Sequence, residues 1–113
     1  MEVNLERIQR DIEAIAMFNA TPNNGVTRFS YSLQDKQAKD YLMSEIKELA
    51  LKTEIDAVGN IRARLEGNNK DGLVVMTGSH IDSVRNGGRF DGVLGVIGAL
   101  EVIRVIKEQN IKT

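Results

Sequence analysis

Cysteine is absent from this 113-residue sequence. Its absence excludes disulfide bonds, zinc sites with thiolate ligands and thiol nucleophiles. Apolar runs are also short, because none approaches the roughly 20 residues that a bilayer-spanning helix needs. The first residues lack the basic and apolar regions of a secretory leader. We therefore expect a cytoplasmic protein that does not enter a membrane.

The sequence also lacks an excess of charge of either sign. Its 15 lysine and arginine residues are balanced by 16 aspartate and glutamate residues. Because no net basic field would attract a phosphate backbone, nucleic acid is not an expected partner. A chain of this length forms at most one domain, although it is large enough to bury a core.

Two segments in the first half of the chain have the apolar spacing of amphipathic helices. The first helix is predicted from residue 5 to about residue 18–20, and the second from Ser32 to about Leu51. Ser32 followed by Asp35 resembles a capping box, in which side chains bind the free N–H groups of a helix start. The two apolar stripes consist of Leu5, Ile8, Ile12 and Ile15, and of Ala38, Leu42, Ile46 and Leu49.

The apolar period changes after the second helix. Residues 53–57 and 61–65 alternate apolar and polar side chains on either side of a glycine turn, which predicts two adjacent strands. Residues 73–76 form a continuous apolar run, typical of a strand covered on both faces. Residues 92 to about 109 are apolar on nearly every side and predict a buried helix. The order helix-helix-strand-strand-strand-helix indicates part of an α/β layered fold.

The only histidine, His80, follows the apolar run of residues 73–76 and lies close to two aspartates in the sequence. Residues two apart on a strand point to the same face, so Asp82 can accept the second ring N–H of a metal-bound His80. Asp91 lies beyond a glycine-rich loop at the start of the last helix, where its carboxylate can face the same cleft. This spacing predicts half of a metal site.

Structural roles are an alternative for each of these three residues. A single histidine is often a hydrogen-bonded core or surface residue. Asp91 could be the N-cap of the last helix, and Asp82 could cap a turn at the strand end. These roles are compatible with metal binding.

Other chemistries fit the sequence less well. Ser79 and Ser83 flank the histidine, but a serine nucleophile needs a base, and the only histidine is assigned to metal. The glycine spacing after residue 86 matches neither a dinucleotide-binding loop nor a phosphate-binding loop. Glu101 lies nearly three helical turns beyond Asp91, which favours a structural ion pair over metal coordination.

Several motifs together resemble the hydantoinase/carbamoylase branch of the metal-dependent aminoacylase and carboxypeptidase superfamily. The resemblance covers almost the whole chain, and the His-x-Asp element followed by Gly-Gly-x-Phe-Asp-Gly is its most specific part. The matching stretches are Gly25-Val26-Thr27-Arg28-Phe29-Ser30-Tyr31-Ser32, Asp56-Ala57-Val58-Gly59-Asn60, Gly78-Ser79-His80-Ile81-Asp82-Ser83-Val84 and Gly87-Gly88-Arg89-Phe90-Asp91-Gly92-Val93-Leu94-Gly95-Val96.

This resemblance implies a binuclear metal-dependent amidohydrolase built on a three-layer α/β/α zinc-peptidase-like catalytic domain. His80 would be a terminal ligand of one metal and Asp91 the carboxylate that bridges two metals. Asp82 would be the catalytic-site residue that orients His80. Two divalent ions, Zn²⁺, Mn²⁺ or Co²⁺, would be the cofactors. The implied substrates are N-carbamoyl-L-amino acids or related ureido compounds such as allantoate, and a homo-oligomer is expected.

The chain departs from the family pattern in what it lacks. The family's general base, a glutamate of an adjacent Glu-Glu pair, and its further histidine and glutamate ligands have no counterpart here, and neither does its lid or dimerisation domain. Residues 1–113 are therefore expected to be an N-terminal fragment of the metal-binding catalytic domain, inactive alone, and no substrate-binding residue is assigned. The alternatives are a non-catalytic, self-associating α/β fragment, a metallopeptidase of the wider superfamily, and a small α/β binding module without metals.

Overall fold

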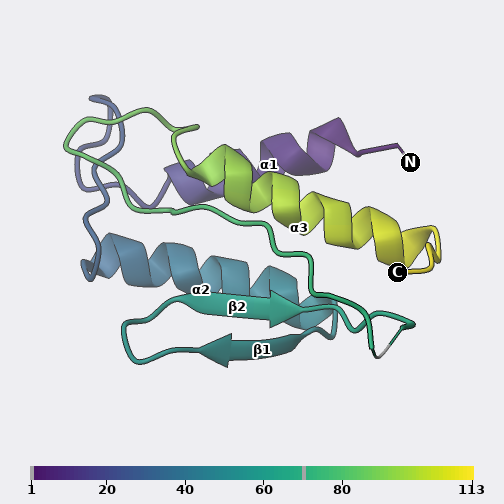
Figure 1. Ribbon diagram of the computed structural model, residues 1–113. Helices are drawn as coiled ribbons and strands as arrows, with labels where there is room; N and C mark the ends of the chain where they lie inside the picture. Colours follow the sequence, from purple (N-terminus) through teal and green to yellow (C-terminus); the bar gives the residue numbers. More distant parts are fainter. Residues whose placement is uncertain (1, 70) are drawn as a thin grey trace.

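The computed structural model describes residues 2–69 and 71–113, and it has the mixed helix and strand composition that the sequence predicts (Figure 1). Three helices and one antiparallel hairpin are present in this part of the chain. None of the helices described is long and apolar enough to cross a bilayer. The elements are α1 (Leu5–Ala16), α2 (Leu33–Glu48), β1 (Lys52–Ile55), β2 (Ile61–Arg64) and α3 (Val93–Glu108).

Side-chain caps determine where the first two helices begin. The Asn4 side chain accepts a hydrogen bond from the backbone N–H of Arg7 at 3.0 Å, before the first turn of α1. Ser32 Oγ accepts from the N–H of Asp35 at 3.2 Å, while the Asp35 carboxylate accepts from the N–H of Tyr31 at 3.0 Å. This reciprocal arrangement confirms the predicted cap, although α2 ends at Glu48, before the predicted end.

The predicted hairpin is confirmed. Strands β1 and β2 pair antiparallel, with Ile55 opposite Ile61. The Asp56 carboxylate closes the turn by accepting from the N–H of Asn60 at 2.9 Å, and Gly59 has a φ of +84°. Because L side chains rarely adopt this conformation, a glycine at this position allows the tight turn.

The prediction of a third strand, at residues 73–76, is wrong. Residues 73–76 form no strand among the described residues, and Leu73 and Val75 are 98% and 95% exposed. The segment is an extended trace that runs between the hairpin and α3 (Figure 1). A continuous apolar run predicts burial only where strands on either side pair with it, and β2 pairs with β1 alone.

The hydrophobic core lies where the three helices meet the extended segment. Helix α1 packs against α3, and Ile81 is the member of the core that the extended segment contributes. Most of the stripe predicted for α1 (Ile8, Ile12 and Ile15) and the first half of the stripe predicted for α2 (Ala38 and Leu42) face this core, whereas Leu5 is 72% exposed. The buried members of the core are Ile12, Ile15, Ala38, Leu42, Ile81, Val93 and Ile97.

A buried ionic network joins α1 to the second half of α3. Arg104 Nη1 lies 2.5 Å from Asp11 Oδ2, and Arg7 Nε lies 2.7 Å from Glu101 Oε2. Burial alone would raise the pKa of Asp11, but hydrogen bonds from Arg104, Tyr41 and Arg10 lower it below its usual value. The hydrogen bonds of Glu101 confirm its predicted structural role.

Replacing Arg104 with methionine should strongly destabilise the fold. The substitution leaves the fully buried Asp11 without its main cation, which we expect to cost about 3 kcal/mol of unfolding free energy. Denaturant unfolding at neutral pH measures the loss. Lys36→Met removes an exposed i,i+4 pair with Asp40 and should change stability by less than about 0.5 kcal/mol. Equal effects of the two substitutions would contradict a stabilising role for the buried network.

Candidate metal centre

The extended segment presents His80 and Asp82 side by side. His80 Nδ1 lies 3.2 Å from Asp82 Oδ1 and 3.0 Å from the main-chain oxygen of the same residue. A carbonyl oxygen can only accept a hydrogen bond, so this geometry favours the neutral tautomer that carries its proton on Nδ1. The second ring nitrogen, Nε2, then offers a lone pair to a metal. The predicted relation between the two residues is present in the structure, although the segment is not a paired strand.

Asp91 lies directly before α3 and faces the other side of the imidazole ring. Its Oδ1 is 3.7 Å from His80 Nε2. The N-cap of α3 is Gly92, and no side chain bonds to the helix start there. The carboxylate of Asp91 therefore does not act as the helix cap that the sequence left open as an alternative.

The donor atoms of His80 and Asp91 fit a shared divalent ion. Nitrogen and oxygen ligands bind Zn²⁺ at about 2.0–2.2 Å, so two ligands of one ion are at most about 4.3 Å apart. The observed 3.7 Å lies within this limit. The side chains of His80 and Asp91 are 51% and 66% exposed, so an ion can reach them from solvent. However, no group of three or more histidine, cysteine or acidic side chains among the described residues could hold a metal.

Two glycines at the start of α3 allow the helix to lie against the histidine. Gly92 has a φ of +69°, and a Cβ there would lie 2.7 Å from His80 Nδ1. At Gly95 a Cβ would lie 2.8 Å from the Cβ of Ser79. These contacts are shorter than real Cβ atoms tolerate, so any larger residue would push α3 and Asp91 away from His80.

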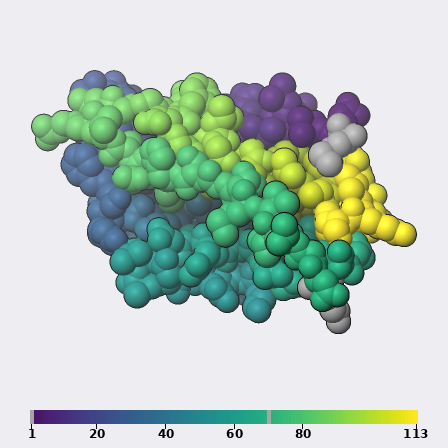
Figure 2. Space-filling model, in the orientation of Figure 1, coloured from purple at the N-terminus to yellow at the C-terminus, as the bar shows by residue number. Residues whose placement is uncertain are grey.

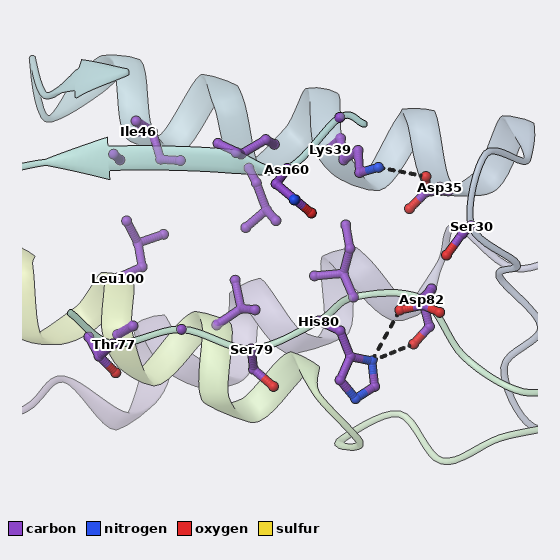
Figure 3. Close-up of a pocket in the computed structure, with 18 of the residues that line it drawn as sticks. Ser30, Asp35, Lys39, Ile46, Asn60, Thr77, Ser79, His80, Asp82 and Leu100 are labelled. Atoms are coloured by element: carbon purple, nitrogen blue, oxygen red, sulfur yellow. Dashed lines mark hydrogen bonds and ion pairs between the residues drawn. The ribbon is translucent and has the colours of Figure 1, made fainter. Parts of the chain in front are cut away.

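His80 and Asp82 lie at one end of a cleft with a volume of about 330 Å³. The cleft runs between β2 and the extended segment, and side chains of α2 and α3 also line it. Figure 2 shows this face hollowed between the hairpin and the extended segment. In Figure 3, Ile46 and Leu100 enter the cleft from opposite sides, and two of the dashed lines join His80 Nδ1 to the main-chain oxygen and to Oδ1 of Asp82. Asp91 is not among the lining residues.

Sequence reasoning missed two residues that support the histidine segment. Arg28 is only 2% exposed, and its Nε donates to the main-chain oxygen of Ile81 at 2.7 Å. Ser83 Oγ accepts from the N–H of Arg28 at 2.9 Å and donates to the oxygen of Val26 at 2.8 Å. Neither role follows a periodic pattern, because the partners are main-chain atoms far away in the sequence. The positions of Arg28 and Ser83 within matching motifs were the available signals.

Known proteins are similar to this chain in both sequence and fold. The pattern that defines Peptidase family M28 matches residues 60–113. An N-carbamoyl-L-amino acid amidohydrolase of Geobacillus stearothermophilus is 41% identical over 108 residues, which are 96% of this chain and 26% of that protein. An allantoate amidohydrolase of Bacillus subtilis is 39% identical over 97 residues, which are 86% of this chain and 24% of that protein.

A solved structure has the same fold over almost the whole chain. The hydantoinase/carbamoylase family amidase from Burkholderia ambifaria superimposes with a TM-score of 0.92 at 36% identity, covering 99% of this chain and 28% of that one. The chain thus spans about a quarter of the length of the relatives it matches.

Replacing Gly92 with alanine should displace His80 from Asp91. The positive φ and the short contacts with the imidazole should lower stability by about 2 kcal/mol, measured by denaturant unfolding. Gly98→Ala is the matched control, because a Cβ there meets nothing within 4 Å inside α3. That control should gain about 0.5–1 kcal/mol from the higher helix propensity of alanine. A neutral Gly92→Ala variant would show that the close approach is not required.

Proposed function

Almost the whole chain corresponds in sequence and fold to one segment of the hydantoinase/carbamoylase amidohydrolases, and on that premise we propose that it is the N-terminal part of a binuclear metal-dependent amidohydrolase. The proposed substrates are N-carbamoyl-L-amino acids or related ureido compounds such as allantoate. The relatives named for these two activities support this substrate class.

The orientation of His80 is the observation that carries this proposal. Asp82 binds Nδ1 and fixes the ring, so that Nε2 points toward Asp91. His80 and Asp91 would act as metal ligands, and Asp82 would keep His80 in the tautomer that binds metal. When bound, two divalent ions such as Zn²⁺, Mn²⁺ or Co²⁺ would polarise the substrate carbonyl and lower the pKa of a water molecule.

The chain by itself is proposed to be inactive. Two protein ligands leave an ion coordinated mainly by water, and the described residues contain no group of three or more histidine, cysteine or acidic side chains that could hold a metal. Hydrolysis also needs a positioned general base. The chain covers 26% of the Geobacillus relative, which supports placing the missing groups in other parts of a longer protein.

Zinc should bind weakly at the single histidine. Titration of Zn²⁺ into the chain, followed through the imidazole ¹⁵N signals of His80, should perturb Nε2 more than Nδ1. Asp82→Asn should weaken the affinity about tenfold, because it removes the carboxylate that orients the ligand. Isothermal titration calorimetry measures zinc affinity in every variant, including the one without histidine. Binding should be lost in His80→Ala, whereas Asp71→Asn, which changes an exposed carboxylate in another loop, should leave it unchanged.

Two outcomes would contradict these roles. Equal zinc affinity in the chain and in His80→Ala would place the metal elsewhere and exclude His80 as a ligand. Hydrolysis of an N-carbamoyl-L-amino acid or of allantoate by the purified chain with added Zn²⁺ or Mn²⁺ would refute the proposed inactivity. A short peptide should be tested in the same assay, because the match to Peptidase family M28 supports peptides as an alternative class of substrate.

Self-association is a second candidate property, and the exposed apolar segment favours it. Residues 73–76 place four neighbouring apolar side chains in solvent, with Leu73 98% exposed. Single exposed apolar residues are common, whereas a contiguous run beside unpaired backbone is a contact site. The occupant proposed is a second copy of this chain, in agreement with the expected homo-oligomer.

A lysine at Val75 should weaken this self-association. Sedimentation velocity should show the chain shifting to larger species as its concentration rises, and Val75→Lys should reduce that shift because a charge opposes strand pairing. Met17→Lys is the control, since Met17 is a similarly exposed apolar residue at the end of α1. A chain that stays monomeric at every concentration would overturn the proposal.

A further inference from the structure

Arg28 is a buried cation whose donors go to main-chain carbonyls. Its Nη1 donates to the oxygens of Ile15 and Phe18, both at 2.9 Å, and its Nε donates to the oxygen of Ile81 at 2.7 Å. The guanidinium therefore links the end of α1 to the peptide between His80 and Asp82. Cations are favourable at a helix C-terminus, where carbonyls lack helical partners.

Burying this charge is unfavourable. Desolvation lowers the pKa of Arg28, and the charges of Asp35 and Asp82 oppose this effect. A neutral side chain could fill the same space without that cost, whereas a planar guanidinium can serve several carbonyls at once. The unusual choice of residue suggests a requirement for fixed geometry at this point.

The backbone of Arg28 also fixes its own position relative to the site. The N–H of Ser83 donates to the oxygen of Arg28 at 2.8 Å, and Ser83 Oγ accepts from the N–H of Arg28. Two residues before Arg28, Val26 exchanges backbone hydrogen bonds with Gly87, at 2.9 and 2.8 Å. The backbone around Arg28 is thus hydrogen-bonded to residues 83–87, the segment that directly follows Asp82.

We propose that Arg28 is a positioning residue that orients His80 through the peptide group between Ile81 and Asp82. The carbonyl that Arg28 binds belongs to that peptide group. Rotation of the group would move both oxygens of Asp82 that contact His80 Nδ1. By preventing the rotation, Arg28 keeps the proton on Nδ1 and leaves Nε2 free. The consequence for metal binding rests on the proposed function, whereas the effect on the tautomer does not.

The single histidine allows a direct test in the metal-free chain. Imidazole ¹⁵N shifts at about pH 8, where the ring of an ordinary histidine is neutral, report the ratio of the two tautomers. In Arg28→Met the ratio of Nδ1–H to Nε2–H forms should fall about 3- to 10-fold, the effect of losing one hydrogen bond of ordinary strength. Arg104→Met removes another buried arginine, distant from His80 in the network of α1 and α3, and should leave the ratio unchanged.

Arg28→Lys decides the matter if Arg28→Met fails to fold. Lysine keeps the buried charge but lacks the planar fork, so it cannot serve all three carbonyls in the same geometry. Its ratio of Nδ1–H to Nε2–H forms should fall below that of the unmodified chain. A folded Arg28→Lys or Arg28→Met variant with an unchanged ratio would overturn the positioning role and leave Arg28 as a purely structural link.

Zinc titration of the same samples separates this inference from the proposed function. Zinc affinity should fall about 10- to 100-fold in Arg28→Lys, as expected when the support of a ligand is lost, and stay unchanged in Arg104→Met. If zinc does not perturb His80 in the unmodified chain, the proposed metal role fails, while the metal-free tautomer ratios still decide the role of Arg28.

Discussion

The close approach of α3 to the histidine segment is the constraint on which the rest of this structure depends. It is possible because Gly92 has no side chain and adopts a positive φ, so that the start of α3 lies directly against His80. The same approach places Val93 and Ile97 on the core side of α3, where they meet Ile81. It also brings Asp91 to the free side of the imidazole. One packing contact therefore forms the core and assembles the candidate site.

The charged side chains at the two ends of α3 differ in burial and in pairing. In its second half, Glu101 and Arg104 are buried and paired with Arg7 and Asp11, which holds the helix against α1. At its start, Asp91 is exposed and has no capping role. Buried charges must be paired to be tolerated, whereas an exposed carboxylate keeps its lone pairs available. The ionic network thus fixes the helix, and the exposed end remains free for binding.

The helices, the hairpin and the proximity of His80 to Asp82 could be predicted from the sequence because each depends on local spacing. Ser32 and Asp35 signal a helix start, and the two-residue separation of His80 and Asp82 places them together even without a paired strand. The strand at residues 73–76 was predicted wrongly, because an apolar run indicates that a segment can be buried but not whether neighbouring strands exist. The role of Arg28 could not be predicted, since its partners are three main-chain carbonyls from two segments that are far from each other in the sequence.

The exposed segment and the cleft beside it have a common physical origin. Strands β1 and β2 are complete as a local hairpin, whereas the extended segment leading to His80 lies apart from β2 across the cleft. Its apolar side chains at residues 73–76 consequently remain in solvent. Near His80 the same segment is held by α3 on one side and by Arg28 on the other. The orientation of the histidine is therefore supported by contacts within this chain, whereas the apolar side chains of residues 73–76 are not covered by any of the described residues. The contacts that orient His80 and those that form the hairpin are separate, which explains how an ordered histidine can lie beside an exposed apolar segment.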